Sequence, residues 1–204
     1  MLSPKRPYVF LTLVLANIGC LAAFAIAGEP AAQQSPQFLG QPLRYWVAQA
    51  TAAGGPRDLD KTVDALIEAV LGDDPDAKRT AADALAALGP KAKKALPALL
   101  SQFGHEFPWV RVSCQAAVGS MGKEAVPALI DTFKNNTGGP RIRAAFVLGS
   151  IGEEAKPAVP IILKTMEKES PVMQERFKGV LRQIDPERFG VADSTKKARY
   201  EATR

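Results

Sequence analysis

The chain has 204 residues, of which 47% are hydrophobic and 7% aromatic. This composition suits one domain with a core of small apolar side chains, and it favours closely packed helices over a sheet sandwich. The formal net charge is +5, but residues 1–27 and 191–204 supply most of it, and the body between them has 20 basic and 19 acidic residues. A nucleic-acid-binding domain concentrates its excess charge on the folded part, so we expect no nucleic-acid partner.

Residues 1–27 have the pattern of an export signal. Lys5 and Arg6 precede twenty uncharged residues, 8–27, which end in the small-residue sequence AIA. We expect cleavage after Ala27. The run is also long enough to span a membrane, so the alternative is an uncleaved anchor with its basic end inside. In both cases we expect an exported protein, periplasmic or extracellular, whose only membrane contact is through residues 8–27 when they are retained.

The predicted folded domain covers residues 42–190 and is flanked by polar segments. Residues 28–41 are rich in Gln and Pro, which indicates a flexible linker, and residues 191–204 have the composition of a disordered tail. The domain begins with two helical patterns, LRYWVAQATAA and LDKTVDALIEAVLG. We assign them to a divergent first helix pair over residues 42–72.

Internal repetition organises the rest of the domain. Gly89, Gly122 and Gly152 each follow apolar residues placed one, four, five and eight positions earlier. That spacing forms one face of a helix, here called helix A, which the glycine ends. Prolines near the predicted starts of these helices are Pro75, Pro108, Pro140 and Pro171.

A second helix, here called helix B, is predicted after each glycine. Pro97, Pro127 and Pro160 share a pattern of apolar residues one position before and two, three and six positions after. Proline fits the first turn of a helix, where its missing N–H has no partner, so each proline marks a helix start. The connector from glycine to proline has five residues in the second unit and eight in the other two, which predicts a tighter turn there.

These helix pairs form a series of predicted units. One pair cannot bury its apolar faces alone, whereas stacked pairs can. The units are residues 75–106, 108–137 and 140–169, followed by a terminal half-repeat, 171–190. We expect this half-repeat to cap the stack, with Lys178, Arg182 and Arg188 facing water.

The run VRVSCQAAVGSMGKEAVPALIDTF resembles the HEAT-like repeats of the phycobilisome-lyase type. That family typically shows V-R-x-x-A-A-x-A-L-G-x-I-G followed by A-V-P-A-L, and the resemblance covers residues 75–185. GQPLRYWVAQ also resembles the phrase that opens such repeats in exported bacterial proteins. The resemblance implies an all-α fold, a right-handed α-solenoid of stacked antiparallel helix pairs, here preceded by a signal or anchor helix.

The resemblance also implies a binding scaffold rather than an enzyme. The chain has one histidine, His105, and one cysteine outside the leader, Cys114, and it lacks the sequence motifs of phosphate loops and nucleophile elbows. We therefore expect no catalytic residue, cofactor or metal site, and a protein or peptide partner. Cys114 is expected to be buried on an alanine-lined helix. The alternatives are a bilin lyase-like enzyme and a membrane-tethered envelope assembly factor.

Two groups of residues are candidates for protein binding. The first is a polar strip on the B helices, four and five positions after each proline. Its members are Ser101, Gln102, Asp131, Thr132, Lys164 and Thr165. The second is the aromatic pair Phe107 and Trp109, which either anchors a partner or packs beneath its own loop. The aligned column Lys78, Arg111 and Arg141 is expected to tie neighbouring repeats together, with a basic binding ladder as the alternative.

Overall fold

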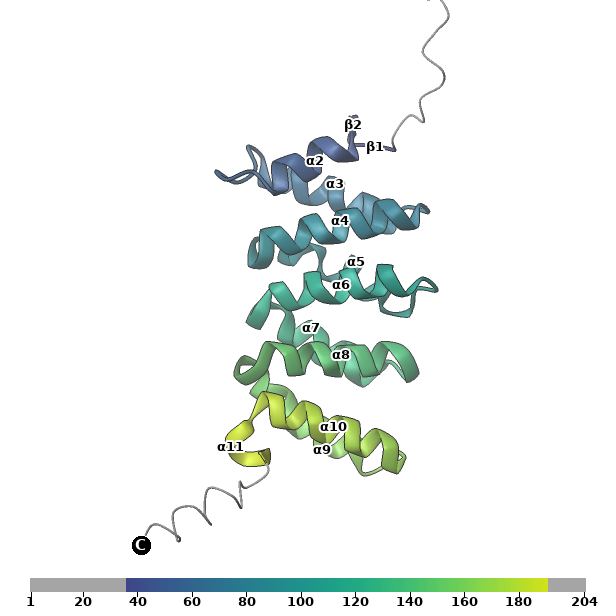
Figure 1. The fold of residues 1–204 in the computed structure, drawn as a ribbon, viewed down its shortest axis with the longest axis vertical. Coiled ribbons are helices and arrows are strands. Elements are labelled where there is room, and N and C mark those ends of the chain that lie inside the picture. Colours follow the sequence, from purple (N-terminus) through teal and green to yellow (C-terminus); the bar gives the residue numbers. More distant parts are fainter. Residues whose placement is uncertain (1–35, 191–204) are drawn as a thin grey trace, which may run out of the picture. The chain divides into compact units, whose positions relative to one another are not determined.

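The computed structural model describes residues 36–190, which form a stack of helix pairs (Figure 1). The A helices are α2 (Leu43–Ala50), α4 (Pro75–Leu88), α6 (Pro108–Ser120), α8 (Gly138–Ile151) and α10 (Pro171–Ile184). The B helices are α3 (Leu59–Leu71), α5 (Leu96–Ser101), α7 (Val126–Asn135) and α9 (Val159–Met166). Helices α4, α6, α8 and α10 pack in succession, so the predicted all-α repeat fold is confirmed in this part of the chain.

The A helices begin close to the prolines that predicted them. The expected starts at Pro75, Pro108 and Pro171 are confirmed, whereas α8 begins at Gly138, two residues before Pro140. The structure tolerates this because the first N–H groups of a helix have no intrahelical partner, so a proline in the third position breaks no bond. The predicted start at Pro140 is therefore wrong by two residues.

The glycines that end the A helices adopt left-handed backbone conformations. The φ angles are +56° at Gly89, +58° at Gly122 and +77° at Gly152, which residues with a side chain rarely adopt. The connectors that follow are 3₁₀ helices rather than simple turns: η1 (Gly89–Ala95), η3 (Gly122–Ala125) and η4 (Gly152–Ala158). The second is the shortest, with four residues against seven in each of the others, as predicted.

Small residues at the centre of the A helices allow these helices to approach one another closely. Ala81, Cys114 and Ala144 occupy equivalent positions and are all fully buried, which confirms the expectation for Cys114. Larger side chains fill the layers between A and B helices. The rings of Phe133 in α7 and Phe177 in α10 meet edge to face, with centroids 5.5 Å apart, so this contact reaches from the second unit to the terminal half-repeat.

The predicted linker is wrong for residues 36–41. Strands β1 (Gln37–Phe38) and β2 (Gln41–Pro42) pair as a short antiparallel hairpin. Phe38 is buried, and its carbonyl accepts a 2.7 Å hydrogen bond from the indole Nε1 of Trp46 in α2. The packed domain therefore extends to the hairpin. The remainder of the predicted linker, the leader and the predicted tail lie outside the described residues.

The other end of the described chain folds back on the stack. There, the short helix α11 (Pro186–Phe189) follows α10. Another short helix, η2 (Gln102–Gly104), lies in the middle of the stack, where it extends α5. Phe189 in α11 packs against the core, and the guanidinium carbon of Arg188 lies 4.9 Å from its ring centroid. Lys178, Arg182 and Arg188 are exposed, as predicted for a terminal half-repeat.

Candidate functional site

The basic column inside the stack binds backbone carbonyls. In the first unit, Lys78 is buried and its Nζ donates to the carbonyl of Val70 at 2.9 Å. In the second, Nη1 of Arg111 donates to the carbonyls of His105 and Glu106 at 2.6 and 2.8 Å. Each cation therefore ties the start of an A helix to the chain that ends the preceding B helix.

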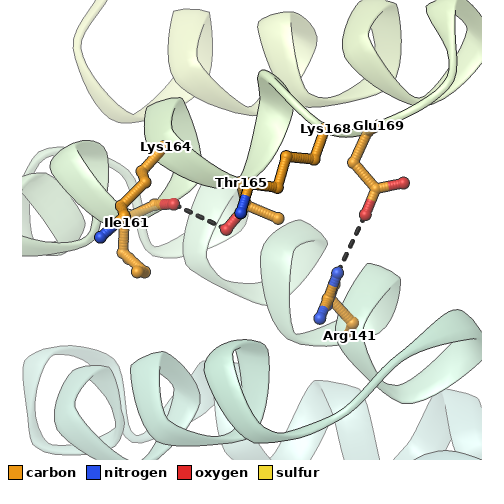
Figure 2. Close-up of a pocket in the computed structure, with 6 residues that line it drawn as sticks. All are labelled: Arg141, Ile161, Lys164, Thr165, Lys168 and Glu169. Atoms are coloured by element: carbon orange, nitrogen blue, oxygen red, sulfur yellow. Dashed lines mark hydrogen bonds and ion pairs between the residues drawn. The ribbon is translucent and has the colours of Figure 1, made fainter.

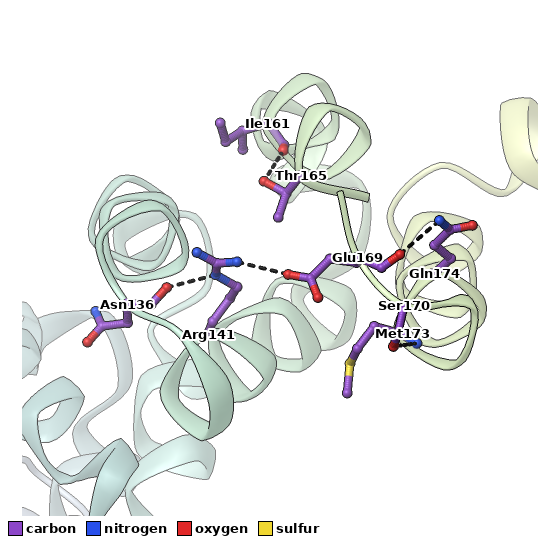
Figure 3. A network of polar contacts seen from close by, with 8 residues as sticks. All are labelled: Asn136, Arg141, Ile161, Thr165, Glu169, Ser170, Met173 and Gln174. Atoms are coloured by element: carbon purple, nitrogen blue, oxygen red, sulfur yellow. Dashed lines mark hydrogen bonds and ion pairs between the residues drawn. The ribbon is translucent and has the colours of Figure 1, made fainter. Parts of the chain in front are cut away.

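The third and fourth units continue this series of contacts (Figure 3). Nε of Arg141 donates to the carbonyl of Asn136 at 2.7 Å, and its Nη1 lies 2.9 Å from Oε1 of Glu169. In the last unit a neutral residue takes the equivalent position, since Nε2 of Gln174 donates to the carbonyl of Glu169 at 3.0 Å. The predicted inter-repeat ladder is confirmed, and Gln174 adds a rung that the search for basic residues missed.

The hydroxyl groups of the B-helix strip are bonded to their own helices. Each donates to a carbonyl three or four residues earlier, which is the usual local bond of Ser and Thr in helices. The pairs are Ser101 with Ala98 at 2.7 Å, Thr132 with Ala128 at 2.8 Å, and Thr165 with Ile161 at 2.9 Å. These hydroxyl oxygens retain acceptor capacity, but their protons are not free for a partner.

The other members of the strip face solvent to different extents. Gln102 is half-buried and its Nε2 donates to Oγ of Ser101 at 2.9 Å. Asp131 and Lys164 are exposed, and neither forms an ion pair with another residue between 36 and 190. The strip therefore offers one carboxylate and one ammonium group on successive B helices.

A shallow hollow of about 220 Å³ lies at the end of the strip beside α9 (Figure 2). Its lining residues are Arg141, Ile161, Lys164, Thr165, Lys168 and Glu169. The Arg141–Glu169 pair and the bonded Thr165 hydroxyl form part of its wall, so Lys164 and Lys168 are its exposed cationic groups. The hollow can accept a carboxylate or a carbonyl from a bound chain.

The aromatic pair divides between the core and the surface. Phe107 is half-buried against the core and stacks on Trp109, with ring centroids 4.7 Å apart and planes inclined by 21°. Trp109 remains 46% exposed. His105 lies in the same loop, where its Nδ1 accepts a 3.2 Å hydrogen bond from the N–H of Phe107. Of the two alternatives predicted for this pair, packing beneath the loop therefore holds for Phe107, whereas Trp109 remains accessible to solvent.

Sequence reasoning missed a surface on the outward side of α6 and α8. Val112 and Phe146 are large exposed apolar side chains there, 63% and 43% exposed. They line a hollow between the two helices together with small and polar residues. The repeat pattern consists of buried positions, but V-R-V at 110–112 and A-A-F at 144–146 also place an apolar residue beside the buried stripe.

The thiol of Cys114 is poorly suited to chemistry. Burial raises its pKa from 9.0 to about 12, although the nearby charge of Lys78 acts in the opposite direction. Within residues 36–190, no cluster of three or more His, Cys, Asp or Glu side chains has the arrangement of a metal site. In the same range, no helix combines the length and the apolar character that a membrane span requires.

Comparison with known families agrees with this architecture. Residues 63–145 match the family model described as HEAT repeats, a segment that runs from α3 into α8. No curated protein shows a significant match to the chain. The matched segment contains complete helix pairs with the ladder between them. Together, the match and the stacked pairs show that this segment of the chain is built of HEAT-like repeats.

Proposed function

We propose that this chain is a non-catalytic scaffold that binds another protein through the outward faces of its stacked helices. The observation that supports this proposal is the stacking of equivalent helices. The A helices lie next to one another, and so do the B helices. Equivalent outward residues therefore form continuous surfaces across several units. The protected Cys114 thiol fits a non-catalytic role. In this proposal the stack is a right-handed solenoid, and the B helices line its concave side.

The B-helix strip is the first surface proposed to contact a partner. Asp131 and Lys164 present opposite charges on successive B helices, and Lys168 extends the strip into the hollow beside α9. This mixed polar character suits a peptide or protein better than a highly charged polymer. Side chains from α5, α7 and α9 would then contact one extended partner.

Site-directed photocrosslinking tests this proposal. A photoreactive residue replaces Asp131 or Lys164 in the full-length chain, which is expressed and irradiated in its native envelope. The same partner should crosslink at both positions and not at Lys91, an exposed control in η1. If neither position captures a specific protein, a scaffold that uses this strip is excluded.

We also propose that the domain functions outside the cytoplasm. Lys5, Arg6 and the uncharged residues 8–27 support export, and AIA before Gly28 supports cleavage. Intact-mass measurement of the exported protein separates the two forms. A mass that begins at Gly28 indicates a released scaffold, and a mass that retains residues 8–27 indicates a membrane-tethered factor. Recovery of the whole protein from the cytoplasm would contradict export.

A further inference from the structure

The outward faces of the A helices are not alike. On α6, Trp109 and Val112 lie one turn apart on the solvent side, and on α8 Phe146 occupies the same side. The corresponding face of α4 is polar, and its Arg79 pairs with Asp76 and Asp83. Among residues 36–190, three of the seven exposed large apolar residues thus lie on these two neighbouring A helices, and the other four, Leu39, Tyr45, Leu71 and Val172, are scattered. A group of exposed apolar side chains of this kind is typical of protein-binding sites.

Two hollows, one between α6 and α8 and one that also reaches Arg176 of α10, share lining residues and are here together called the α6–α8 groove. The first, about 510 Å³ and open to solvent, is lined by Val112, Gln115, Ala116, Gly119, Ser120, Phe146, Val147 and Ser150. The second, about 310 Å³, is lined by Gln115, Gly139, Ile142, Arg143, Phe146 and Arg176. Gln115 and Phe146 belong to both. The small side chains at 116, 119, 120 and 150 leave room beside Phe146 for an apolar side chain from outside.

The groove has a strongly basic end. Helices α6, α8 and α10 together hold six basic residues and one acidic residue, Glu175, which is already paired with Lys178 and Arg182. Arg143 and Arg176, which line the second hollow, form no ion pair within residues 36–190. Partial burial, and secondarily the charge of Arg111, lowers the pKa of Arg143. A carboxylate near Arg143 would favour the charged guanidinium and so act against both effects.

We propose that the α6–α8 groove binds an amphipathic, acidic segment of a partner protein. An apolar side chain of the segment enters beside Phe146, and its carboxylates pair with Arg143 and Arg176. Bidentate arginine–carboxylate bonds give such a contact both energy and direction. The inference deepens the proposed function, on which it rests, by naming a second binding face and the chemistry of its partner.

Two other occupants fit the groove less well. A second copy of this chain would bring Arg143 and Arg176 towards their own equivalents, and like charges oppose such an interface. A nucleic acid would satisfy the arginines but would leave the apolar surface of Val112 and Phe146 without a matching contact unless its bases stacked there. An amphipathic acidic helix matches both halves of the groove.

The test uses a displayed library of helical peptides, selected on the immobilised full-length chain. Selected peptides should be enriched in Asp and Glu, with apolar residues spaced three or four apart. Their affinities are then measured in solution by fluorescence anisotropy. Binding should weaken at least tenfold in each of three variants: Phe146→Ser, Arg143→Glu, and Arg176→Glu at an exposed position. Binding of the parent should also weaken as the salt concentration rises.

Matched controls separate the groove from general surface effects. Val172→Ser removes an exposed apolar side chain from α10 outside the groove, and Arg44→Glu reverses an exposed charge on α2. Both should leave affinity within twofold of the parent. Circular dichroism melting curves of all variants verify that the stack is intact, so that a loss of binding can be assigned to the surface.

Four results would overturn the proposal. They are a selection without enrichment for acidic residues, peptides that bind the Phe146→Ser variant as tightly as the parent, binding of single-stranded DNA that depends on Arg143 and Phe146, and self-association in sedimentation that Phe146→Ser abolishes. Crosslinking of a partner at Asp131 and Lys164 without peptide binding here would overturn this inference alone. Specific binding confined to the α6–α8 groove would instead argue against the B-helix strip.

Discussion

Arg141 and Glu169 form the least exposed ion pair in the described part of the chain. Their Nη1 and Oε1 atoms are 2.9 Å apart, and their side chains are 20% and 25% exposed. The same guanidinium donates through Nε to the carbonyl of Asn136, and the backbone carbonyl of Glu169 accepts from Gln174. These two residues therefore connect the third unit with both of its neighbours (Figure 3).

Arg141→Ala should lower the free energy of unfolding by about 1–3 kcal/mol, because it removes two charge-assisted hydrogen bonds from a partly buried site. Glu169→Gln, which keeps the backbone carbonyl, should cost about half as much. Arg79→Ala is the control: its pairs with Asp76 and Asp83 are exposed, so it should cost less than about 0.5 kcal/mol. Urea denaturation followed by circular dichroism measures all three, and equal costs for Arg141→Ala and Arg79→Ala would contradict a role for the ladder.

Two adjacent residues of the hairpin should respond differently to truncation. Phe38 is buried, so Phe38→Ala should destabilise the fold by about 2–4 kcal/mol and shift the fluorescence of Trp46. Leu39 is 54% exposed at the turn, and Leu39→Ala should change stability by less than about 0.5 kcal/mol. Thermal unfolding monitored by tryptophan fluorescence distinguishes them, and a neutral Phe38→Ala would place the hairpin outside the cooperative fold.

Glycine-to-alanine substitutions should have opposite signs at two positions. Gly122 has a φ angle of +58°, so Gly122→Ala should destabilise the chain by about 1 kcal/mol. Gly179 lies inside α10, and an added Cβ would meet open space. Gly179→Ala should therefore stabilise the chain by about 0.5–1 kcal/mol through its helix propensity. Melting temperatures report both, and shifts of the same sign would refute the assigned roles.

The buried Cys114 thiol should make stability fall at alkaline pH. Its pKa is raised from 9.0 to about 12, so between these values the unfolded chain loses a proton that the folded chain keeps. The free energy of unfolding should then decrease by about 1.4 kcal/mol per pH unit across this window, and below pH 9 the thiol should have no effect. At pH 10.5 the loss attributable to this group is roughly 2 kcal/mol relative to pH 8.

Cys114→Ala provides the reference for this pH effect. Alanine already fills the equivalent positions, Ala81 and Ala144, so the variant keeps the packing pattern of the repeat. The difference in unfolding free energy between the parent and Cys114→Ala removes the titration of other groups. It should change from pH 8 to pH 10.5 in favour of the variant. A constant difference would show that burial does not perturb the thiol.

The repeated elements were predictable from sequence because each signal occurs three times. The A helices end near the glycines that the pattern identifies, Gly89, Gly122 and Gly152. The prolines of the B helices also lie at the starts of those helices, as their pattern predicts. The hairpin at 37–42 was missed because two-residue strands have no measurable alternation. Its turn also places Leu39, a non-glycine residue, at a φ angle of +46°.

Sites were harder to predict than helices. The Gln174 rung was missed because a neutral amide replaces the basic residue while the geometry persists. The α6–α8 groove was missed because the net charge of the body is close to zero: acidic residues in α3 and in the loops between units, such as Asp73, Asp74 and Glu106, offset the arginines of α6, α8 and α10. A face-by-face count of charge along each helix would have found the imbalance.

The ladder depends little on the side chains of the loops that it bonds. Its main acceptors are backbone carbonyls, those of Val70, Asn136 and Glu169 among them. Every residue supplies the same backbone carbonyl, whatever its side chain. The loop before each A helix can therefore change its sequence and keep its hydrogen bond. The hydrogen bond that joins each A helix to the preceding loop is therefore insensitive to the side chains of that loop.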